Sequence, residues 1–368
     1  MKACSNKIVF IIMSLSQPRC IKRVSSLAKS GFNCVVYGYN RGLYDVNKYP
    51  ASIELHELGT MHNGEVYANL KTMRKDVKQI LRDNGTDCLY YCFGLLSLIF
   101  VFARKDIKYV YEISDIPYAY PKYNRISFLI KALDKIIIRQ SSLTVMTSGG
   151  FNNYFKVNNG RIIIQPNKVS PILKNLDRSP RELTVCRYNF AFIGSIRYNT
   201  VLRFAQIIGE FFPQHEFHFY GGAAKDRLSQ VLALAEKYDN IKYHGLFKSP
   251  DDLISIYNAI DIVVACYDNS SQNERIAEPN KLYESICFCK PIVVSGGTYL
   301  ADRVKELCCG FVLENQSSDS IVRFIRQIDV SSVNEISNRD LSLNEDAFID
   351  DMSILTKRIS DVFGKMNG

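Results

Sequence analysis

The sequence predicts an α/β protein with two doubly wound, Rossmann-like domains, each a parallel sheet covered by helices. Its 368 residues are too many for one ordinary hydrophobic core and sufficient for two. Short apolar runs alternate with helical patterns through both halves of the chain, as parallel strands and their crossover helices do. The alternation lapses between Pro166 and Cys186, where prolines and a charged run are typical of an interdomain linker.

The first half of the chain supplies the elements of the first domain. Its apolar runs predict strands at 7–13, 33–38, 88–92, 109–113, 143–147 and 161–164. Helical periodicity predicts helices at 21–30, 65–84, 94–104 and 124–140. The run at 8–13 is too short for the hydrophobic region of a signal peptide, and the run at 95–103 is too short to span a bilayer. Both runs therefore indicate buried elements.

The second half repeats the same alternation. Strands are predicted at 189–193, 216–220, 240–244, 261–266 and 291–295, and helices near 200–212, 225–237, 250–258 and 281–289. Several strands end at glycine, including Gly194, Gly221 and Gly245. Glycine at these turns lets backbone N–H groups approach a phosphate closely.

The pattern predicts the domain boundaries as well. The first domain is expected at 1–170, a linker at 171–185 and the second domain at 186–345. A final helix, predicted at 346–363, lies in a terminal segment (346–368) that is expected to pack back toward the first domain. Ligands of open α/β sheets bind beyond the carboxyl ends of the strands, so the cleft between the domains is the expected site.

Composition narrows the class of partner. The formal net charge of +9 favours an anionic partner such as a nucleotide, a phosphorylated lipid or an acidic membrane face. No RNA-binding aromatic strand motif is present, so nucleic acid is not the expected partner. The eleven cysteines include no CxxC pair and only five histidines accompany them, so no metal site is expected. Most cysteines lie in apolar runs, which indicates buried thiols in a reducing cytoplasm.

The most informative motif is Glu278-Pro-Asn-Lys-Leu-Tyr-Glu284. Pro279 breaks the chain and Lys281 opens a helix, whose N-terminus carries partial positive charge and N–H donors for a diphosphate. Lys281 and Glu284 stand three apart on one helical face. A cation can then face a phosphate while a carboxylate accepts hydrogen bonds from vicinal hydroxyls. Taken alone, the same spacing fits a surface Lys–Glu pair on a packing helix.

This motif resembles the donor-site helix of the family-four-like group of retaining glycosyltransferases, which have the GT-B fold and include many enzymes of bacterial capsule and exopolysaccharide synthesis. Other matches follow in the expected order along the chain. They are Ser16-Gln-Pro-Arg-Cys-Ile-Lys-Arg23, Gly38-Tyr-Asn-Arg41, Tyr111-Glu-Ile-Ser-Asp115, Thr147-Ser-Gly-Gly-Phe151, Ile193-Gly-Ser-Ile-Arg197 and His244-Gly245. The ordered set is more specific than any single match.

The resemblance implies a donor site for a nucleoside-diphosphate sugar of the UDP or GDP type, with no further cofactor. Glu284 would bind the ribose hydroxyls, and Arg197 would pair with the diphosphate through its planar fork of donors. Lys281 would assist at the phosphates, and Asn280, Gly194 and Ser195 would belong to the same donor site. The segments Tyr220-Gly221 and His244-Gly245-Leu246 would flank the base, mostly through backbone groups. A solvated loop arginine is the alternative for Arg197.

One position departs from the family pattern. Many members carry a second glutamate eight residues before the first, and Ile276 stands there in this sequence. Glu274 and Glu278 are close to that position but out of register. The sequence therefore leaves open which group contacts the donor sugar.

The resemblance also implies a metal-independent, retaining transfer in which the cations and the helix N-terminus stabilise the leaving diphosphate. Asp115, at the end of the strand 109–113, is the candidate for acceptor binding or base work, and a turn cap is its alternative. The implied acceptor is a glycan carried on a polyprenyl diphosphate. Arg19, Lys22 and Arg23, near the first loop, could face that acceptor, and a solvated position is their alternative.

A basic stripe in the predicted helix 124–140 suggests a membrane surface. Lys131, Lys135 and Arg139 stand at i, i+4 and i+8 beside a wide apolar surface. A basic amphipathic helix is typical of an element that lies on an anionic membrane, here the inner face of the cytoplasmic membrane. An ordinary domain helix with a solvated face is the alternative.

Other function classes fit less well. A sugar-nucleotide epimerase on the same architecture needs an acid/base set with histidine, and the five histidines form no convincing set. A non-catalytic sugar- or nucleotide-binding protein stays open. A nicotinamide dehydrogenase is disfavoured because no Gly-x-Gly-x-x-Gly follows the first strand.

Overall fold

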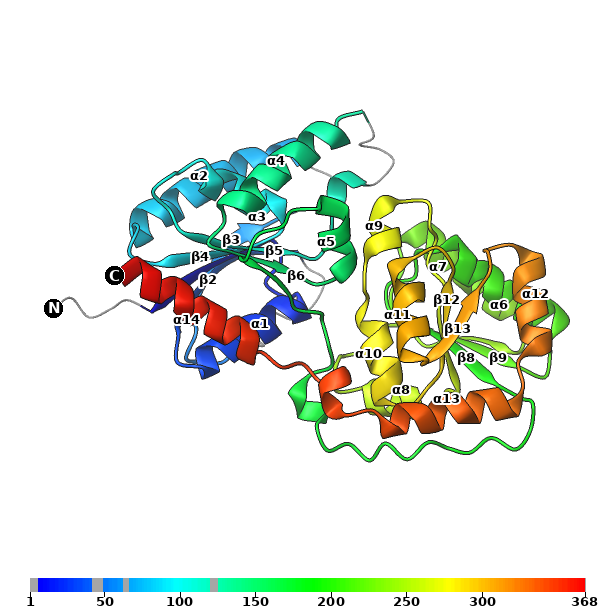
Figure 1. Ribbon diagram of the computed structural model, residues 1–368. Coiled ribbons are helices and arrows are strands. Elements are labelled where there is room, and N and C mark those ends of the chain that lie inside the picture. Colours follow the sequence, from blue (N-terminus) through cyan, green and yellow to red (C-terminus); the bar gives the residue numbers. More distant parts are fainter. Residues whose placement is uncertain (1–5, 42–48, 62–65, 120–124, 368) are drawn as a thin grey trace. The chain divides into compact units, whose positions relative to one another are not determined.

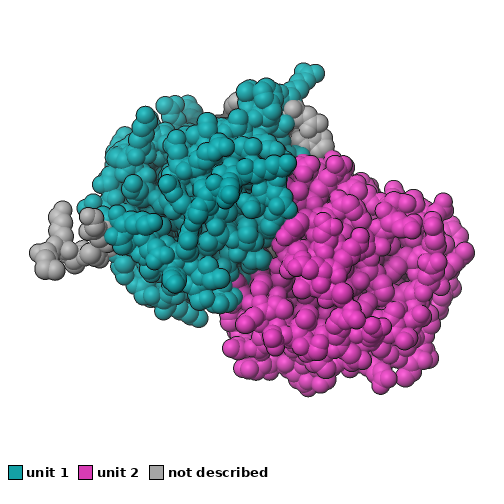
Figure 2. Space-filling view, viewed as in Figure 1, with its two compact units in different colours: residues 1–166, 351–368 teal, residues 167–350 magenta. Residues whose placement is uncertain are grey.

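The computed structural model describes residues 6–41, 49–61, 66–119 and 125–367. The chain divides into two compact units: unit 1 holds residues 1–166 and 351–368, and unit 2 holds residues 167–350 (Figure 2). Each unit has its own parallel sheet with helices packed on it, seven-stranded in unit 1 and six-stranded in unit 2 (Figure 1). The predicted fold class of two doubly wound α/β domains is confirmed.

The sheet of unit 1 has the strand order β3-β2-β1-β4-β5-β6-β7. Its strands are β1 (Lys7–Ile12), β2 (Asn33–Asn40), β3 (Glu54–Thr60), β4 (Leu89–Phe93), β5 (Tyr109–Ile113), β6 (Leu143–Met146) and β7 (Ile162–Ile164). Its helices are α1 (Pro18–Lys29), α2 (Val66–Asn84), α3 (Leu95–Phe102), α4 (Ser127–Gln140), α5 (Gly149–Phe155) and α14 (Ser353–Asn367). The strand order reverses between β1 and β4, as it does in doubly wound sheets.

β1 lies inside the sheet because its sequence is apolar on both faces. The strand pairs in parallel with β2 on one side and with β4 on the other. Ile8, Phe10 and Ile12 are buried in the core of unit 1. A strand covered on both faces has a continuous apolar run in place of an alternating one. The run at 8–13 therefore belongs to a central strand.

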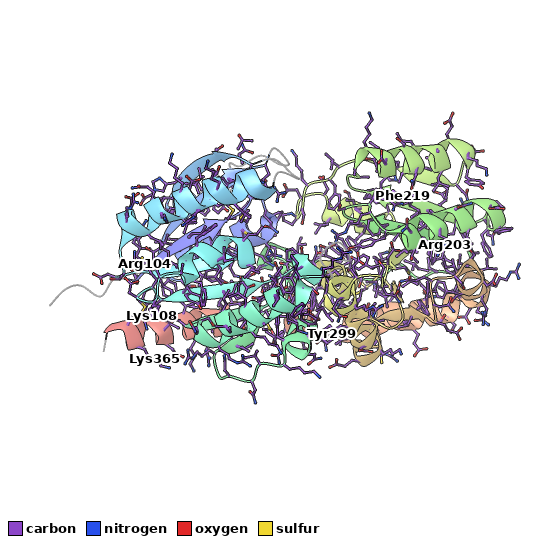
Figure 3. The ribbon with its side chains drawn as sticks, turned by 90° about the horizontal axis from the view of Figure 1, so that it is seen from above. Arg104, Lys108, Arg203, Phe219, Tyr299 and Lys365 are labelled. Atoms are coloured by element: carbon purple, nitrogen blue, oxygen red, sulfur yellow. The ribbon has the colours of Figure 1, made fainter. Side chains whose placement is uncertain are left out.

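The C-terminal helix α14 belongs to unit 1, and Figure 3 shows it from a second direction with Lys365 labelled near its end. Leu355, Ile359 and Phe363 are spaced four apart and are buried on one helical face in the core of unit 1. The ring of Phe363 stacks on that of Phe32 at 5.8 Å between centroids. The final helix was expected at 346–363, and that start is wrong by seven residues. The segment Glu345–Ala347 instead forms a 3-10 turn, η4, in unit 2.

The sheet of unit 2 has the strand order β10-β9-β8-β11-β12-β13. Its strands are β8 (Asn189–Ile193), β9 (Glu216–Tyr220), β10 (Ile241–Tyr243), β11 (Ile262–Ala265), β12 (Ile292–Ser295) and β13 (Gly310–Leu313). Its helices are α6 (Asn199–Phe211), α7 (Lys225–Lys237), α8 (Leu253–Asn258), α9 (Gln272–Ile276), α10 (Asn280–Cys287), α11 (Tyr299–Leu307), α12 (Ser318–Gln327) and α13 (Val330–Ser342).

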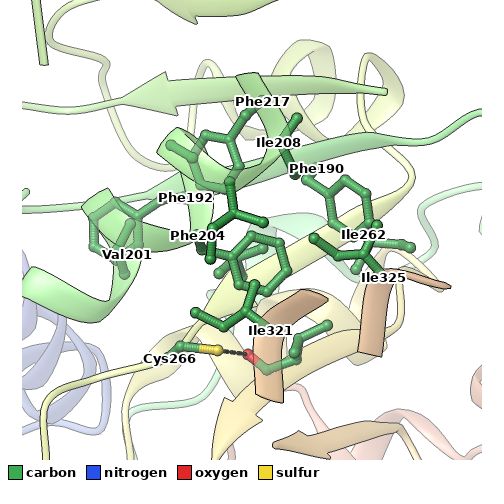
Figure 4. Close-up of a cluster of buried hydrophobic side chains, with 14 of the residues drawn as sticks. Phe190, Phe192, Val201, Phe204, Ile208, Phe217, Ile262, Cys266, Ile321 and Ile325 are labelled. Atoms are coloured by element: carbon green, nitrogen blue, oxygen red, sulfur yellow. Dashed lines mark hydrogen bonds between the residues drawn. The ribbon is translucent and has the colours of Figure 1, made fainter. Parts of the chain in front are cut away.

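One core cluster of unit 2 is rich in phenylalanine (Figure 4). Phe190 of β8 and Phe204 of α6 lie 5.5 Å apart between ring centroids, and Phe204 lies 6.1 Å from Phe217 of β9. Cys266 also belongs to this cluster, and its thiol donates a hydrogen bond to the carbonyl of Val293 at 3.4 Å. The thiol is buried, as the cysteine pattern predicts for this residue.

Several elements have no counterpart among the predicted ones. They are β3, β13, α5, α9, α11, α12 and α13. The strand β3 is an edge strand with mostly exposed, polar residues, so it has no apolar run to reveal it. The helices bury only narrow stripes, such as Ile321 and Ile325 of α12, within a polar sequence. The hydrophobic pattern in the sequence is weak wherever a helix or strand contributes few side chains to the core.

The expected linker, 171–185, lies within unit 2. Arg178 fixes it there, because its guanidinium donates to the carbonyls of Ile286 and Cys287 at 3.0 and 3.1 Å and to that of Leu343 at 3.1 Å. It also donates to the carbonyl of Asp340. A cation at helix C-terminal carbonyls satisfies acceptors that the helix leaves unbonded. Arg178 therefore ties this segment to the ends of α10 and α13, and the chain passes from unit 1 to unit 2 at 166/167 and back at 350/351.

Candidate functional site

Three glycine turns meet at the carboxyl ends of neighbouring strands in unit 2. Gly194, Gly221 and Gly245 follow β8, β9 and β10 with φ angles of +136°, +129° and +78°. Gly194 donates its N–H to the carbonyl of Tyr220 at 2.8 Å, and Gly221 donates to that of Gly245 at 2.7 Å. A Cβ on Gly221 would lie 2.0 Å from the carbonyl oxygen of Gly194. Only glycine permits this backbone packing, at the edge where such sheets bind ligands.

The predicted base-flanking residues come together at the same edge. Tyr220 stacks on His244 with ring centroids 4.2 Å apart and planes 6° apart. Leu246 is 71% exposed, and a Cβ on Gly222 would lie 2.8 Å from its side chain. The structure thus joins an aromatic pair and an exposed apolar side chain beside the glycine turns. Their contact with a base stays a prediction.

Glu284 lies on α10 and is only 3% exposed. Its Oε2 accepts a hydrogen bond from the Tyr257 hydroxyl at 2.8 Å and from the Lys281 ammonium at 2.6 Å. Its Oε1 accepts from the amide of Asn280. A buried carboxylate needs such donors, because an unpaired buried charge is strongly unfavourable. The carboxylate is therefore held in one orientation before any ligand binds.

Lys281 lies between the glycine turns and Glu284. A Cβ on Gly194 would lie 3.5 Å from the Lys281 Cε, so the lysine stem passes along that turn. Its ammonium, buried and paired with Glu284, lies 5.8 Å from the ring centroid of Phe247. The sequence motif predicts a lysine that faces phosphate and a glutamate that faces ribose. The structure adds that the two side chains are bonded to each other.

Arg197 lies in the loop between β8 and α6, and its side chain is exposed. Its Nη2 donates to the hydroxyl of Tyr198 at 2.7 Å, and the guanidinium carbon lies 5.0 Å from the Tyr198 ring centroid. Burial raises the pKa of Tyr267 well above its usual range, and the charges that act on this phenol include Arg197 and Glu284. The predicted diphosphate and ribose ligands therefore belong to one neighbourhood, with exposed Ser195 in the same loop.

Comparison with known proteins identifies the fold. No protein-family model matches the chain. Over 98% of its length the chain is similar to Anabaena Alr3699/HepE, solved in complex with UDP and glucose, with a TM-score of 0.72 and 15% identity over 99% of that protein. It is also similar to sucrose-phosphate synthase of Thermosynechococcus elongatus, with a TM-score of 0.71 and 13% identity over 97% and 95% of the two chains. The chain has the GT-B fold.

Two further similarities support this assignment. WaaG, a glycosyltransferase involved in lipopolysaccharide biosynthesis, matches with a TM-score of 0.64 and 14% identity over 97% of this chain and 99% of its own. The succinoglycan biosynthesis protein ExoL of Rhizobium meliloti (strain 1021) is 20% identical over 94% of this chain and 90% of its own length. The likeness to these GT-B structures spans both units of the chain.

The carboxylates near Ile276 have distinct surroundings in this GT-B chain. Glu278 accepts hydrogen bonds from the Tyr283 hydroxyl and, at 3.2 Å, from Nε of Arg303, so it is engaged with α11. Glu274 is half-buried on α9 and accepts from the Ser271 hydroxyl at 3.0 Å. Burial raises its pKa, and the hydrogen bonds from Ser271 and, to a smaller extent, the charge of Arg197 act against that shift. The two carboxylates therefore have different partners, Arg303 and Tyr283 for Glu278 and Ser271 for Glu274.

In unit 1, Arg19 of α1 is mostly buried. Its side chain is 16% exposed, and its Nε lies 3.5 Å from the buried carboxylate of Glu112. The neighbouring Arg23 is fully buried and also pairs with Glu112, at 3.1 Å. Arg19 therefore lies mostly buried beside Glu112, and its contact with an acceptor stays a prediction. Asp115 is exposed after β5, and its acceptor or base role stays a prediction.

Helix α4 exposes both apolar and basic side chains. Phe128 is 65% exposed and Leu129 is 58% exposed, which is unusual for large apolar residues. Arg139 is exposed, Lys135 is half-buried, and the ammonium of Lys131 lies 3.5 Å from the ring centroid of Tyr154. The predicted basic stripe is thus present, although Lys131 partly covers an aromatic ring. In the described ranges no helix has the length and apolar character needed to cross a bilayer.

Most supporting residues of the site have no signal in the sequence. Tyr257 and Tyr267 are tyrosines in ordinary apolar surroundings, and only the structure brings them to Glu284 and Tyr198. Asp268, which accepts a hydrogen bond from the backbone N–H of Thr200 at the start of α6, lies in a polar loop. Acidic residues are common in such loops, so the sequence does not single it out. Among residues 6–41, 49–61, 66–119 and 125–367 no group of three or more His, Cys, Asp or Glu side chains has the geometry of a metal site.

Proposed function

We propose that this protein is a glycosyltransferase that moves a sugar from a nucleoside diphosphate to a glycan acceptor in polysaccharide biosynthesis. The observation that carries the proposal is the buried Glu284 carboxylate, oriented by Tyr257, Lys281 and Asn280 beside the glycine turns of unit 2. The GT-B fold, the HepE structure with UDP and glucose, and the similarity to ExoL support it.

The donor site follows from the residues on unit 2. Glu284 would accept hydrogen bonds from the ribose hydroxyls, and the exposed guanidinium of Arg197 would pair with the diphosphate. As the glycosidic bond to the leaving diphosphate breaks, negative charge grows on its oxygens. Arg197 and Lys281 would stabilise that charge, so the proposed reaction needs no metal ion.

The proposed stereochemical course is retention, as the sequence resemblance implies. The acceptor hydroxyl oxygen forms a bond to the anomeric carbon on the face that the diphosphate leaves. The bond between that carbon and the diphosphate oxygen breaks, and the leaving phosphate takes the hydroxyl proton. Asp115 of unit 1 is the proposed acceptor-side residue, as a hydrogen-bond acceptor for the incoming hydroxyl.

A lipid-linked glycan is the proposed acceptor, and an anionic membrane surface is the proposed location. The exposed Phe128 and Leu129 on α4, with Lys135 and Arg139 on the same helix, support this. Apolar side chains that enter the headgroup region and cations that meet anionic lipids are the two contributions to interfacial binding. The proposal places the enzyme at the inner face of the cytoplasmic membrane.

Ligand binding and product analysis test the function. Titration calorimetry with UDP, GDP, free sugars and NAD should give binding of one nucleoside diphosphate, and E284Q should lose most of it. The matched control is E306Q, an exposed glutamate on α11, which should bind like the wild type. Binding of free sugar alone would contradict the proposal and favour a sugar-binding protein.

A second experiment separates transfer from epimerisation. The wild type is incubated with the sugar nucleotide that it binds and with a lipid-linked glycan. A glycosyltransferase releases nucleoside diphosphate and extends the glycan with the donor's anomeric configuration. An epimerase leaves the sugar nucleotide intact and changes only the sugar.

A further inference from the structure

The N-terminus of α6 is already occupied by a carboxylate of the chain. Asp268 accepts hydrogen bonds from the backbone N–H groups of Asn199 and Thr200, both at 2.9 Å. It also accepts from the Thr200 hydroxyl at 2.7 Å and the Asn199 amide at 3.2 Å. The helix that follows the first strand commonly binds phosphate in such sheets. Here these two N–H groups serve Asp268, which leaves the neighbouring Arg197 as the group to meet a diphosphate.

Tyr198 is the residue between Arg197 and this capped helix, and it is only 6% exposed. Its ring stacks on Tyr267 with centroids 4.3 Å apart and planes 25° apart, and the edge of Phe192 packs against it at 6.2 Å. A ring packed in this way has one position. The hydroxyl of Tyr198 accepts from Arg197 at 2.7 Å, and the guanidinium lies over the same ring. The arginine therefore has two contacts with one fixed side chain.

The support for Tyr198 continues into the neighbouring loops. Tyr267 and Asp268 are consecutive residues. Tyr267 stacks on Tyr198, and Asp268 caps α6, the helix that begins directly after Tyr198. The carbonyl of Tyr267 accepts from the Gln316 amide at 2.8 Å, and the carbonyl of Gln316 accepts from Arg203 of α6. Figure 3 labels Arg203 on this helix. The loop after β11 is thus bonded directly to the start of α6 through Asp268, and it is linked to Arg203 of the same helix through Gln316.

We infer that Tyr198 is a positioning residue that aims Arg197 at the donor diphosphate, and that Tyr267 and Asp268 hold Tyr198 for this task. The inference rests on the proposed function, since it needs a diphosphate for Arg197 to bind. Tyr198 orders the long arginine side chain before the ligand arrives, so less conformational entropy is lost when the ligand binds.

The variant Y198F tests this, because it keeps the stacked ring and removes the hydroxyl that Arg197 binds. Calorimetry compares the nucleoside diphosphate that the wild type binds, UDP or GDP, with its nucleoside. Y198F should weaken the diphosphate roughly tenfold, the loss of one hydrogen bond to a charged group. The nucleoside should bind as tightly as to the wild type. Y238F, a tyrosine at the end of α7, is the matched control and should change neither affinity.

A double-mutant cycle separates positioning from general stability. In an R197A background, Y198F should cause no further loss of diphosphate affinity, because the two residues act as one unit. Equal losses for nucleoside and diphosphate, additive losses in the cycle, or wild-type affinity of Y198F would each overturn the inference. If the wild type binds no nucleoside diphosphate, the proposed function itself is wrong, which is a different outcome.

Discussion

The buried hydroxyl of Tyr257 on α8 donates to Oε2 of Glu284 on α10 at 2.8 Å. The ring of Tyr257 stacks on the ring of Phe288, with centroids 4.4 Å apart. This packing holds the tyrosine ring in place and thereby fixes the position of its hydroxyl. Burial raises the pKa of the Tyr257 phenol well above its usual range, which keeps it a donor at any physiological pH. The orientation of the proposed ribose ligand therefore depends on a residue outside the motif.

Replacing Tyr257 with phenylalanine should weaken both the fold and nucleotide binding. The buried carboxylate loses one donor, which costs about 1–3 kcal/mol of unfolding free energy. Urea denaturation measures this loss, and calorimetry should show weaker binding of the nucleoside diphosphate. Y238F serves as the control and should unfold like the wild type. A Y257F protein with unchanged nucleotide affinity would show that Glu284 does not need this donor.

The second prediction concerns the stability that the buried Lys281–Glu284 ion pair provides. K281M keeps the lysine stem along Gly194 and removes the ammonium that lies 2.6 Å from Glu284. Breaking a buried ion pair leaves a charge uncompensated and should lower the unfolding free energy by roughly 3 kcal/mol. The double variant K281M/E284Q should recover part of this loss, because no buried charge then remains. K305M, an exposed lysine on α11, is the control and should change stability little.

Asp340 should make stability depend on pH. It is fully buried on α13, and within the described ranges neither carboxylate oxygen has a hydrogen-bond partner. Burial raises its pKa from 3.8 to about 8, with Arg178 and Arg339 acting against the shift. The folded state then binds more protons than the unfolded state between these values, so this group's contribution to stability falls as pH rises from about 4 to about 8.

The variant D340N tests that sign. An amide stays neutral, so D340N should gain melting temperature over the wild type as pH rises from 5 to 8. D239N replaces an exposed aspartate and should follow the wild type across the same range. If the difference between D340N and the wild type were the same at both pH values, Asp340 would not titrate in this interval.

Arg178 should be essential for the C-terminal ends of α10 and α13. R178M removes the donors to the carbonyls of Ile286, Cys287 and Leu343 and leaves those acceptors in a buried region. Hydrogen bonds from a charged group contribute about 1.5–3 kcal/mol each, so the total loss should exceed roughly 3 kcal/mol. Lysine should not rescue it, since one ammonium cannot span the same carbonyls. R181M, an exposed arginine nearby, should have little effect on urea denaturation.

Membrane binding should depend on both parts of α4. The wild type should sediment with phosphatidylcholine vesicles only when they contain phosphatidylglycerol. F128S/L129S should lose binding because the apolar side chains no longer enter the interface. K135E/R139E should also lose binding to the anionic vesicles, because two cations that attract the headgroups become two repelling carboxylates. L232S changes an exposed leucine on α7 and should bind like the wild type. Binding of F128S/L129S at the wild-type level would contradict a role of α4.

Sequence patterns predicted the strands that build the two cores and the helices between many of them. The apolar runs of β1, β5 and β8 are complete within five or six residues, so each strand is specified locally. The start of α14 was misplaced by seven residues, because the segment Glu345–Ala347 forms the 3-10 turn η4 in unit 2. Segments such as β3 were missed because an exposed edge strand has no apolar run.

The sequence by itself determined the fold class and selected Glu284 and Arg197, because these depend on patterns within a few residues of the chain. Only the tertiary structure decided what surrounds them. Tyr257 reaches Glu284 from 27 residues away, and Arg23 reaches Glu112 from 89 residues away. Such pairings arise from the packing of whole helices and strands, so no local pattern encodes them. Lys281 and Glu284 stand only three residues apart and Arg197 and Tyr198 are adjacent, so these contacts are local. The tertiary structure adds the burial of the Lys281–Glu284 pair and the packing of Tyr198 on Tyr267.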